Sequence, residues 1–187
     1  MLVRAGVNKL RLIDFDQVSL SSLNRHAVAT LGDVGTPKAA CLKKHFNLIA
    51  PQVHVEAINQ LFSRDVADVL LAGNPDYVLD CIDNIETKID LIEISFKKGF
   101  NIISSMGAGA KADPSRICIA DFTYTQEDPL ARRVRRDLRK RGIMKGVEVV
   151  YSVEVPQLKL LPLEDEKVDI ADEYATLPNF RSRYAFY

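Results

Sequence analysis

The sequence predicts an α/β fold with a mostly parallel sheet and helices on both of its faces. Short apolar or alternating segments, typical of strands, are separated by segments in which apolar residues recur every three or four positions, typical of helices. Strands are predicted at residues 9–15, 53–57, 77–82, 101–104, 116–120 and 147–155. Helices are predicted at residues 37–50, 65–71 and 85–98, and from residue 128 onward.

The first predicted strand, residues 9–15, brings two carboxylates to its end. Leu10 and Leu12 alternate with charged residues, which is a strand pattern. Asp14 and Asp16 close the apolar run. Ligands of open α/β sheets bind at the carboxyl ends of strands. We therefore expect these acids to hold ribose hydroxyls or a metal ion.

A lysine stands in the first turn of the next predicted helix. Thr36 is the predicted N-cap of the helix at 37–50, because Pro37 suits a first helical turn. Lys38 follows, where a cation opposes the helix macrodipole at a cost of about 0.3–1 kcal/mol. An anion between the ammonium and the helix end would remove this cost. The alternative is an exposed lysine that points away from the helix end.

The polar loop at residues 17–35 carries a second cation, Arg25, between Asn24 and His26. A guanidinium can hold a phosphate through charge-assisted hydrogen bonds, so Arg25 is a candidate phosphate ligand. His26 is expected to cap the chain or to hydrogen-bond locally.

The strand at 77–82 is a compact apolar run suited to the middle of a parallel sheet. It ends at Asp83, and Glu86 three residues later predicts a capping pair for the helix at 85–98. The buried stripe of this helix is predicted to contain Ile85, Ile89, Ile92 and Phe96.

Cysteine and glycine positions add weaker signals. Cys41, Cys81 and Cys118 are far apart, which argues against a structural zinc site and fits a reducing compartment. Cys118 is predicted to pack inside the strand at 116–120. Gly107 and Gly109 follow the strand at 101–104 and are either turn glycines or part of a substrate-contacting loop.

The last predicted helix opens at Asp128-Pro129, an N-cap followed by proline. Leu130, Val134 and Leu138 form a narrow apolar stripe on it. Residues 131–141 contain seven Arg or Lys and one Asp. Such a run is usually a solvated face, but this excess predicts contact with nucleic-acid phosphates. The predicted contact residues are Arg132, Arg133, Arg135, Arg136, Arg139 and Lys140.

Composition limits the other classes of protein. The formal net charge is zero, with 47% hydrophobic and 27% charged residues, which is ordinary globular usage. No apolar run reaches the roughly 18 residues that a membrane-spanning helix needs, and no signal peptide is evident. We expect a single domain over residues 1–187, in which 156–187 is an acidic, less ordered C-terminal segment.

Several of these motifs resemble a known family. The segments 12–26, 34–38 and 79–84 are similar to the adenylating fold of ubiquitin-activating (E1-like) enzymes and of bacterial thiamin and molybdopterin sulfur-carrier adenylyltransferases. Segments 104–117 and 128–139 resemble one branch, the tRNA threonylcarbamoyladenosine dehydratases in their fungal form. The resemblance implies a Rossmann-like domain that here lacks the first strand and glycine-rich loop, in a chain truncated at both ends.

The resemblance also implies chemistry and partners. ATP with Mg²⁺ would activate the carboxylate of threonylcarbamoyladenosine in tRNA, and an internal nucleophile would then close a ring. The implied catalytic residues are Arg25, Lys38 and Asp83, with Asp83 as metal ligand. The implied nucleotide-binding residues are Asp14, Asp16, Ser22, Asn24, Arg25, Lys38, Asp83 and Asn84. It further implies a homodimer that is cytoplasmic or faces the cytosol at the mitochondrial outer membrane, with membrane association only through parts missing from this chain.

Two alternatives remain at this point. The first is an E1-like activator of a ubiquitin-like or sulfur-carrier protein, which would share the ATP motifs. The missing Cys-x-x-Cys and the basic helix count against it. The second is a non-catalytic, truncated tRNA-binding relative, favoured by the missing glycine-rich loop.

Overall fold

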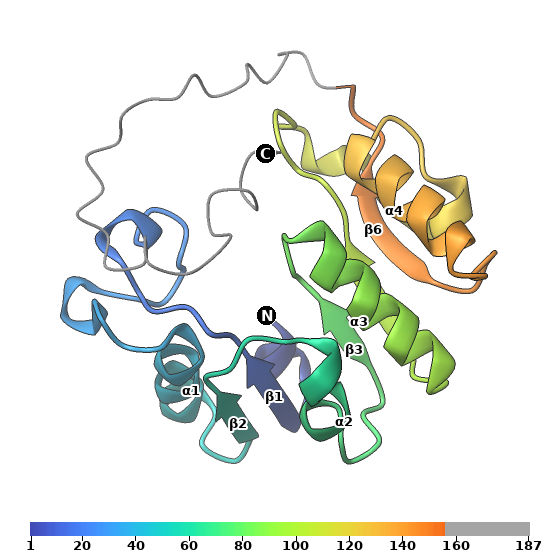
Figure 1. The fold of residues 1–187 in the computed structure, drawn as a ribbon. Coiled ribbons are helices and arrows are strands. Elements are labelled where there is room, and N and C mark those ends of the chain that lie inside the picture. Colours follow the sequence, from blue (N-terminus) through green and yellow to red (C-terminus); the bar gives the residue numbers. More distant parts are fainter. Residues whose placement is uncertain (156–187) are drawn as a thin grey trace, which may run out of the picture. The chain divides into compact units, whose positions relative to one another are not determined.

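The computed structural model describes residues 1–155, so the acidic segment predicted at 156–187 lies outside the described residues. The chain divides into two compact units, the first ending at Leu70 and the second beginning at Leu71 (Figure 1). Each unit has a sheet of its own. A single domain over the whole chain stays a prediction.

The first unit is a parallel strand–helix–strand crossover. Strand β1 pairs in parallel with β2, in a register that runs from Lys9 opposite His54 to Ile13 opposite Ile58. The core consists of the buried residues Val3, Ala50, Val53 and Val55, and Leu10 of β1 packs against it. The elements are η1 (Leu2–Ala5), β1 (Lys9–Ile13), η2 (Leu20–Ser22), η3 (Leu31–Asp33), α1 (Lys38–Ile49), β2 (His54–Ile58), η4 (Arg64–Val66) and α2 (Ala67–Leu70).

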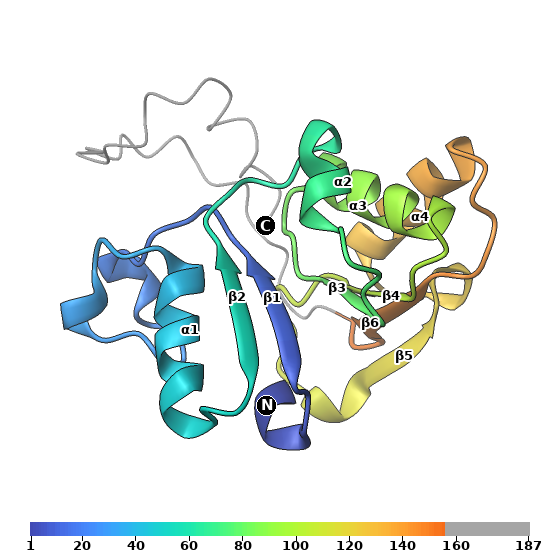
Figure 2. The ribbon, with the colours of Figure 1, turned by 90° about the horizontal axis from the view of Figure 1, so that it is seen from below.

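The second unit contains a sheet of strand order β3-β4-β6-β5. The β3–β4 and β4–β6 pairs are parallel, whereas β5 pairs antiparallel with β6. Helices α3 and α4 contact each other and lie on the same face of this sheet (Figure 2). The elements are β3 (Val78–Asp80), α3 (Ile85–Lys97), β4 (Ile102–Ser105), η5 (Pro114–Arg116), β5 (Ile117–Asp121), η6 (Phe122–Tyr124), α4 (Pro129–Lys140) and β6 (Glu148–Ser152).

Most of the predicted apolar stripes are buried. Val134 and Leu138 of α4 are fully buried, as is Ile92 of α3. Phe96 is 39% exposed, so its predicted burial is wrong. Its ring lies beside Gly146, where an added Cβ would approach it to 3.3 Å, and the turn before β6 covers only part of it. Cys118, also predicted to be buried, is half-exposed on β5, the edge strand of this sheet.

Helix starts confirm one predicted cap and correct two. Asp128 caps α4 by accepting a hydrogen bond from the Ala131 amide at 3.0 Å, with proline in the first turn as predicted. Pro37, not Thr36, is the N-cap residue of α1, because the Thr36 hydroxyl donates to a preceding carbonyl. Asn84, not Asp83, caps α3 by accepting from the Thr87 amide at 3.0 Å.

No helix within residues 1–155 is long and apolar enough to cross a membrane.

The loop between β1 and α1 has local structure of its own. Thr30 and Asp33 form a capping box around η3, in which the Thr30 amide and hydroxyl donate to the Asp33 carboxylate at 2.9 and 2.7 Å. These hydrogen bonds from Thr30, together with Lys44, lower the pKa of Asp33 to about 2. The ionised carboxylate therefore holds the loop that leads into α1.

The substitution Asp33→Asn is expected to destabilise the chain in a pH-dependent way. Because the folded-state pKa is below the ordinary value, the stabilisation is fully present above about pH 4 and is lost as the pH falls towards about 2. Urea unfolding of both proteins, followed by circular dichroism across this range, measures the difference. A difference that does not change with pH would contradict the role of the carboxylate charge.

Candidate nucleotide-binding site and basic helix

Three predicted site residues of the first unit lie together at the end of β1. The Asp16 amide donates to Asp14 Oδ1 at 2.8 Å. The Lys38 ammonium lies 2.6 Å from Asp16 Oδ2, and the Lys38 amide donates to the Asp16 carbonyl at 2.9 Å. In this structure Asp16 is therefore the anion that offsets the cation at the start of α1. The Lys38 and Asp16 side chains are 20% and 41% exposed, so an incoming anion can reach the pair.

The Asp14 carboxyl differs electrostatically from its neighbour. Burial raises the pKa of Asp14, and the charge of Asp16 adds to the rise, whereas the Asp16 amide and Lys38 oppose it. Hydrogen bonds from a donor would therefore stabilise the charged form of Asp14, and ribose hydroxyls are donors of this kind.

The other predicted ligands of the loop are engaged locally. Arg25 is exposed and donates to the Ser21 carbonyl at 2.8 Å and to Asn24 Oδ1 at 3.1 Å. Ser22 is buried, and its hydroxyl completes the capping box of η2. His26 Nδ1 accepts a hydrogen bond from a following amide at 3.1 Å, which confirms its expected local role. Asn24 and Arg25 are the exposed members of this group.

In the second unit, Asp83 and Asn84 lie in the turn that joins β3 to α3. Asp83 is exposed at the carboxyl end of a parallel strand. The Asn84 side-chain oxygen is occupied by the Thr87 amide and hydroxyl. Asn84 therefore shapes the turn, and Asp83 beside it is exposed.

A buried polar cluster that the sequence analysis missed supports this turn. Lys88 Nζ lies 2.8 Å from Asp80 Oδ2, and these side chains are 1% and 0% exposed. The Ser104 hydroxyl donates to the same carboxylate oxygen at 2.5 Å. We call Asp80, Lys88 and Ser104 the buried triad. The available signal was a lysine on the same helix face as Ile85 and Ile92, with an aspartate inside an apolar strand.

No group of three or more His, Cys, Asp or Glu side chains within residues 1–155 is arranged to hold a metal ion. Mg²⁺ in nucleotide sites usually keeps several waters and takes one or two carboxylates together with substrate phosphates. An exposed strand-end carboxylate such as Asp83 fits this requirement as a single ligand.

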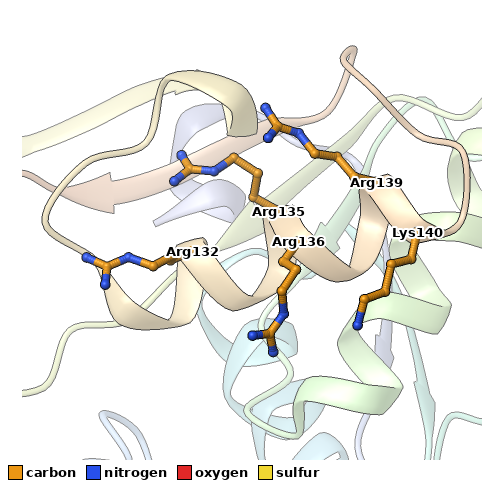
Figure 3. A pocket seen from close by; sticks show the side chains of 5 residues that line it. All are labelled: Arg132, Arg135, Arg136, Arg139 and Lys140. Atoms are coloured by element: carbon orange, nitrogen blue, oxygen red, sulfur yellow. The ribbon is translucent and has the colours of Figure 1, made fainter.

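Helix α4 presents the basic groove, a surface depression of about 510 Å³ lined only by cations. Arg132, Arg135 and Arg139 project from one side of the helix, and Arg136 and Lys140 project from another (Figure 3). The buried stripe of the same helix holds it against the second unit. The groove therefore concentrates positive charge on a fixed element.

Ion pairs divide these cations into two groups. Asp137 lies within 4 Å of Arg133, Arg136 and Lys140 and partly neutralises them. The Arg135 guanidinium donates to the Thr125 carbonyl and hydroxyl. The Arg132 and Arg139 side chains make no hydrogen bond or ion pair with any other described residue. They are two helical turns apart on one side, a separation of about 10 Å.

The loop after β4 is fastened to the start of this helix. The buried Asp128 carboxylate, besides capping α4, accepts from the Gly107 amide at 3.0 Å and lies 3.7 Å from Lys111 Nζ. Glu154 accepts from the amides of Ala112 and Asp113 at the far end of the loop. A side chain at position 107 would meet Asp128 at 3.1 Å, so this approach explains the glycine.

Comparison with known proteins decides the family. The sequence model of the ThiF family matches residues 1–177. The chain belongs to the ThiF family. It is 52% identical to tRNA threonylcarbamoyladenosine dehydratase 2 of Saccharomyces cerevisiae over 97% of this chain and 42% of the yeast protein. It is 37% identical to the dehydratase of Bacillus subtilis over 94% of this chain and 68% of that protein. This ThiF-family chain thus spans less than half the length of the yeast relative.

Solved structures agree with the sequence comparison. Escherichia coli tRNA N6-threonylcarbamoyladenosine dehydratase (TcdA), in complex with ATP, matches with a TM-score of 0.77 and 29% identity, over 83% of this chain and 67% of that chain. A structure of the same protein in complex with AMP matches with a TM-score of 0.78. The likeness confirms the predicted Rossmann-like α/β fold of the E1-like type.

The substitution Lys88→Met is expected to lower the free energy of unfolding by about 3–5 kcal/mol, because it leaves Asp80 buried without its cation. Lys97→Met on the same helix is the control, since Lys97 is 63% exposed in its pair with Glu93. That pair is expected to contribute about 0–1 kcal/mol. Urea unfolding followed by circular dichroism measures both variants, and equal losses would contradict the importance of the buried pair.

Proposed function

We propose that this chain carries the adenylating part of an ATP-dependent dehydratase that cyclises N6-threonylcarbamoyladenosine in tRNA. The observation that carries the proposal is the basic groove of α4, found in a chain whose relatives are named as such dehydratases. TcdA in complex with ATP and with AMP supports a nucleotide as co-substrate.

The strand-end cluster supports the nucleotide half of the proposal. Asp14 would accept hydrogen bonds from ribose hydroxyls, which the raised pKa of this carboxyl favours. Lys38 would exchange its partner Asp16 for a phosphate, since their 2.6 Å ion pair is partly exposed. Arg25 would swing from its local hydrogen bonds to a phosphate oxygen, because its partners are a neutral carbonyl and an amide.

The course of the proposed reaction is the one that the resemblance to the tRNA dehydratases implies. The substrate carboxylate attacks the α-phosphorus of ATP and pyrophosphate leaves, which converts the carboxylate into an acyl adenylate. A nitrogen or oxygen of the same modified nucleoside then attacks the activated carbonyl carbon and AMP leaves. Lys38 and Arg25 stabilise the negative charge that develops on the phosphates. Neither of these two steps requires a cysteine thiol of the enzyme.

Asp83 is proposed to hold Mg²⁺ together with the phosphates, as its exposed strand-end position allows. The metal would supply charge neutralisation at the phosphates. Homodimerisation and a location in the cytoplasm or facing the cytosol at the mitochondrial outer membrane are also part of the proposal. They rest on the resemblance to the fungal enzymes.

The basic groove supports the tRNA half and favours it over activation of a carrier protein. A sulfur-carrier activator of Escherichia coli, molybdopterin-synthase adenylyltransferase, is 33% identical over 72% of this chain, less on both measures than the yeast dehydratase. Arg132 and Arg139 would contact tRNA phosphates directly, whereas Arg133 and Lys140 keep Asp137 as a partner.

In calorimetric titrations with Mg-ATP, Lys38→Ala and Arg25→Ala are each expected to lower affinity by about tenfold or more, because each removes a charge-assisted phosphate contact. Lys44→Ala is the matched control, since Lys44 lies on the same helix and also pairs with a carboxylate, that of Asp33. Affinity lost equally in the Lys38 and Lys44 variants would contradict the assigned role. A folded wild-type chain that does not bind Mg-ATP would contradict the nucleotide half of the proposal.

In tRNA-binding titrations at several salt concentrations, Arg132→Gln is expected to reduce the slope of log affinity against log salt by about one. Arg133→Gln makes the same change in net charge at the neighbouring position, but Arg133 already pairs with Asp137. The salt-dependence slope of the Arg133→Gln variant is therefore expected to stay close to that of the wild type. Equal changes in slope would show that overall charge, and not the groove, governs binding.

A further inference from the structure

The buried triad links three elements at the carboxyl ends of β3 and β4. Asp80 belongs to β3, Lys88 to α3 and Ser104 to β4. Besides its pair with Asp80, the Lys88 ammonium donates to the carbonyl of Ser105 at 3.0 Å. The Ser105 hydroxyl in turn donates to the Asp80 carbonyl at 3.1 Å. The ends of both strands are therefore held to each other and to the helix.

Stability alone does not account for a charged pair in this position. Lys88 is in the first half of α3 and is buried together with the apolar residues Ile89 and Ile92 of the same helix. Replacing a buried ion pair by apolar residues of similar volume is often neutral or stabilising. What an apolar residue cannot supply is a directional contact to a strand-end carboxylate and a carbonyl at once.

The contacts of the triad converge on the turn that carries Asp83. Asp80 Oδ1, the carboxylate oxygen not used by Lys88, accepts from the Ile82 amide at 3.0 Å. On the other side, Asn84 accepts from the Thr87 amide at 3.0 Å. Asp83 lies between these two hydrogen-bonded turns, so its backbone is held on both sides while its side chain is exposed.

We propose that Asp80, Lys88 and Ser104 are positioning residues, which hold the Asp83 turn in the geometry that the ATP-dependent reaction needs. The inference rests on the proposed function, because it assigns the triad to the step in which Asp83 acts. A carboxylate on an exposed turn contributes to catalysis only if the turn is preorganised, since small misplacements of reacting groups lower rates strongly. The triad never touches substrate and acts through Asp83.

The test compares Ser104→Ala with Ser95→Ala. Both serines are fully buried, but the Ser95 hydroxyl, on α3, has no hydrogen-bond partner among the described residues. Each variant removes one buried hydroxyl, and only Ser104→Ala weakens the triad. Two quantities are measured on the whole chain: amide hydrogen exchange of residues 81–84, and formation of AMP from ATP with tRNA that contains threonylcarbamoyladenosine.

Ser104→Ala is expected to accelerate exchange in residues 81–84 and to lower kcat, each by about tenfold, with KM for ATP within about twofold of wild type. Ser95→Ala is expected to leave all three within about twofold. If Ser104→Ala does not fold, Ser105→Ala provides the test, because the exposed Ser105 donates to the backbone carbonyl of Asp80 and so helps to hold this member of the triad in place. About a threefold change in the same quantities is then expected.

Equal exchange in Ser104→Ala and Ser95→Ala would overturn the inference. Faster exchange with unchanged kcat would overturn its catalytic part. A wild-type chain that forms no AMP with tRNA would contradict the proposed function and with it the catalytic part. The exchange comparison would still decide whether the triad holds the turn.

Discussion

In both units a carboxylate at or just beyond the end of a parallel strand is paired with a lysine of the helix that follows. Asp16 after β1 pairs with Lys38 of α1 at 2.6 Å, and Asp80 of β3 pairs with Lys88 of α3 at 2.8 Å. Strand ends leave backbone polar groups without ladder partners. The same lysines satisfy one such group each, because the Lys38 amide donates to the Asp16 carbonyl and the Lys88 ammonium donates to the Ser105 carbonyl. The first pair belongs to the cluster of Asp14, Asp16 and Lys38, and the second supports the turn that carries Asp83, whereas Ser22, Asn24 and Arg25 are held by local contacts of their loop.

The two pairs differ in burial, and this difference separates their roles. The Lys38–Asp16 pair is partly exposed, so a phosphate can compete for the ammonium in a solvated setting where ion pairs contribute little to stability. The Lys88–Asp80 pair is excluded from water and cannot exchange partners without uncovering a charge. The first therefore suits ligand binding, and the second suits the fixing of a turn. The same combination of residue types thus suits two different proposed roles, because the surrounding packing differs.

Local signals in the sequence were sufficient for elements with strong periodicity. The start of α4 at Asp128-Pro129 and the burial of Val134 and Leu138 were predicted because cap chemistry and apolar spacing act within a few residues. The caps of α1 and α3 were each predicted one residue too early. The Thr36 hydroxyl donates to the Asp33 carbonyl, and Asn84 next to Asp83 accepts the capping hydrogen bond of α3, a choice between adjacent residues that the sequence does not rank. The predicted burial of Phe96 was wrong because the exposure of its ring depends on the turn at Gly146, which is far away in the chain.

The order of residues along the chain was enough to indicate the strand–helix alternation, the acids at the end of β1 and the cationic surface of α4, because these depend on spacing and composition within single elements. Only the tertiary structure decided which cations have partners outside α4: Arg135 donates to Thr125, and Arg141, just after the helix, donates to Asp90 and Glu93 of α3. The pairs of Asp137 with Arg133 and Lys140, by contrast, lie within α4 and follow from spacings of four and three residues. The buried triad also required the fold, since Asp80 and Ser104 are 24 residues apart and meet only when β3 and β4 pair. Contacts between elements depend on packing that no local pattern specifies.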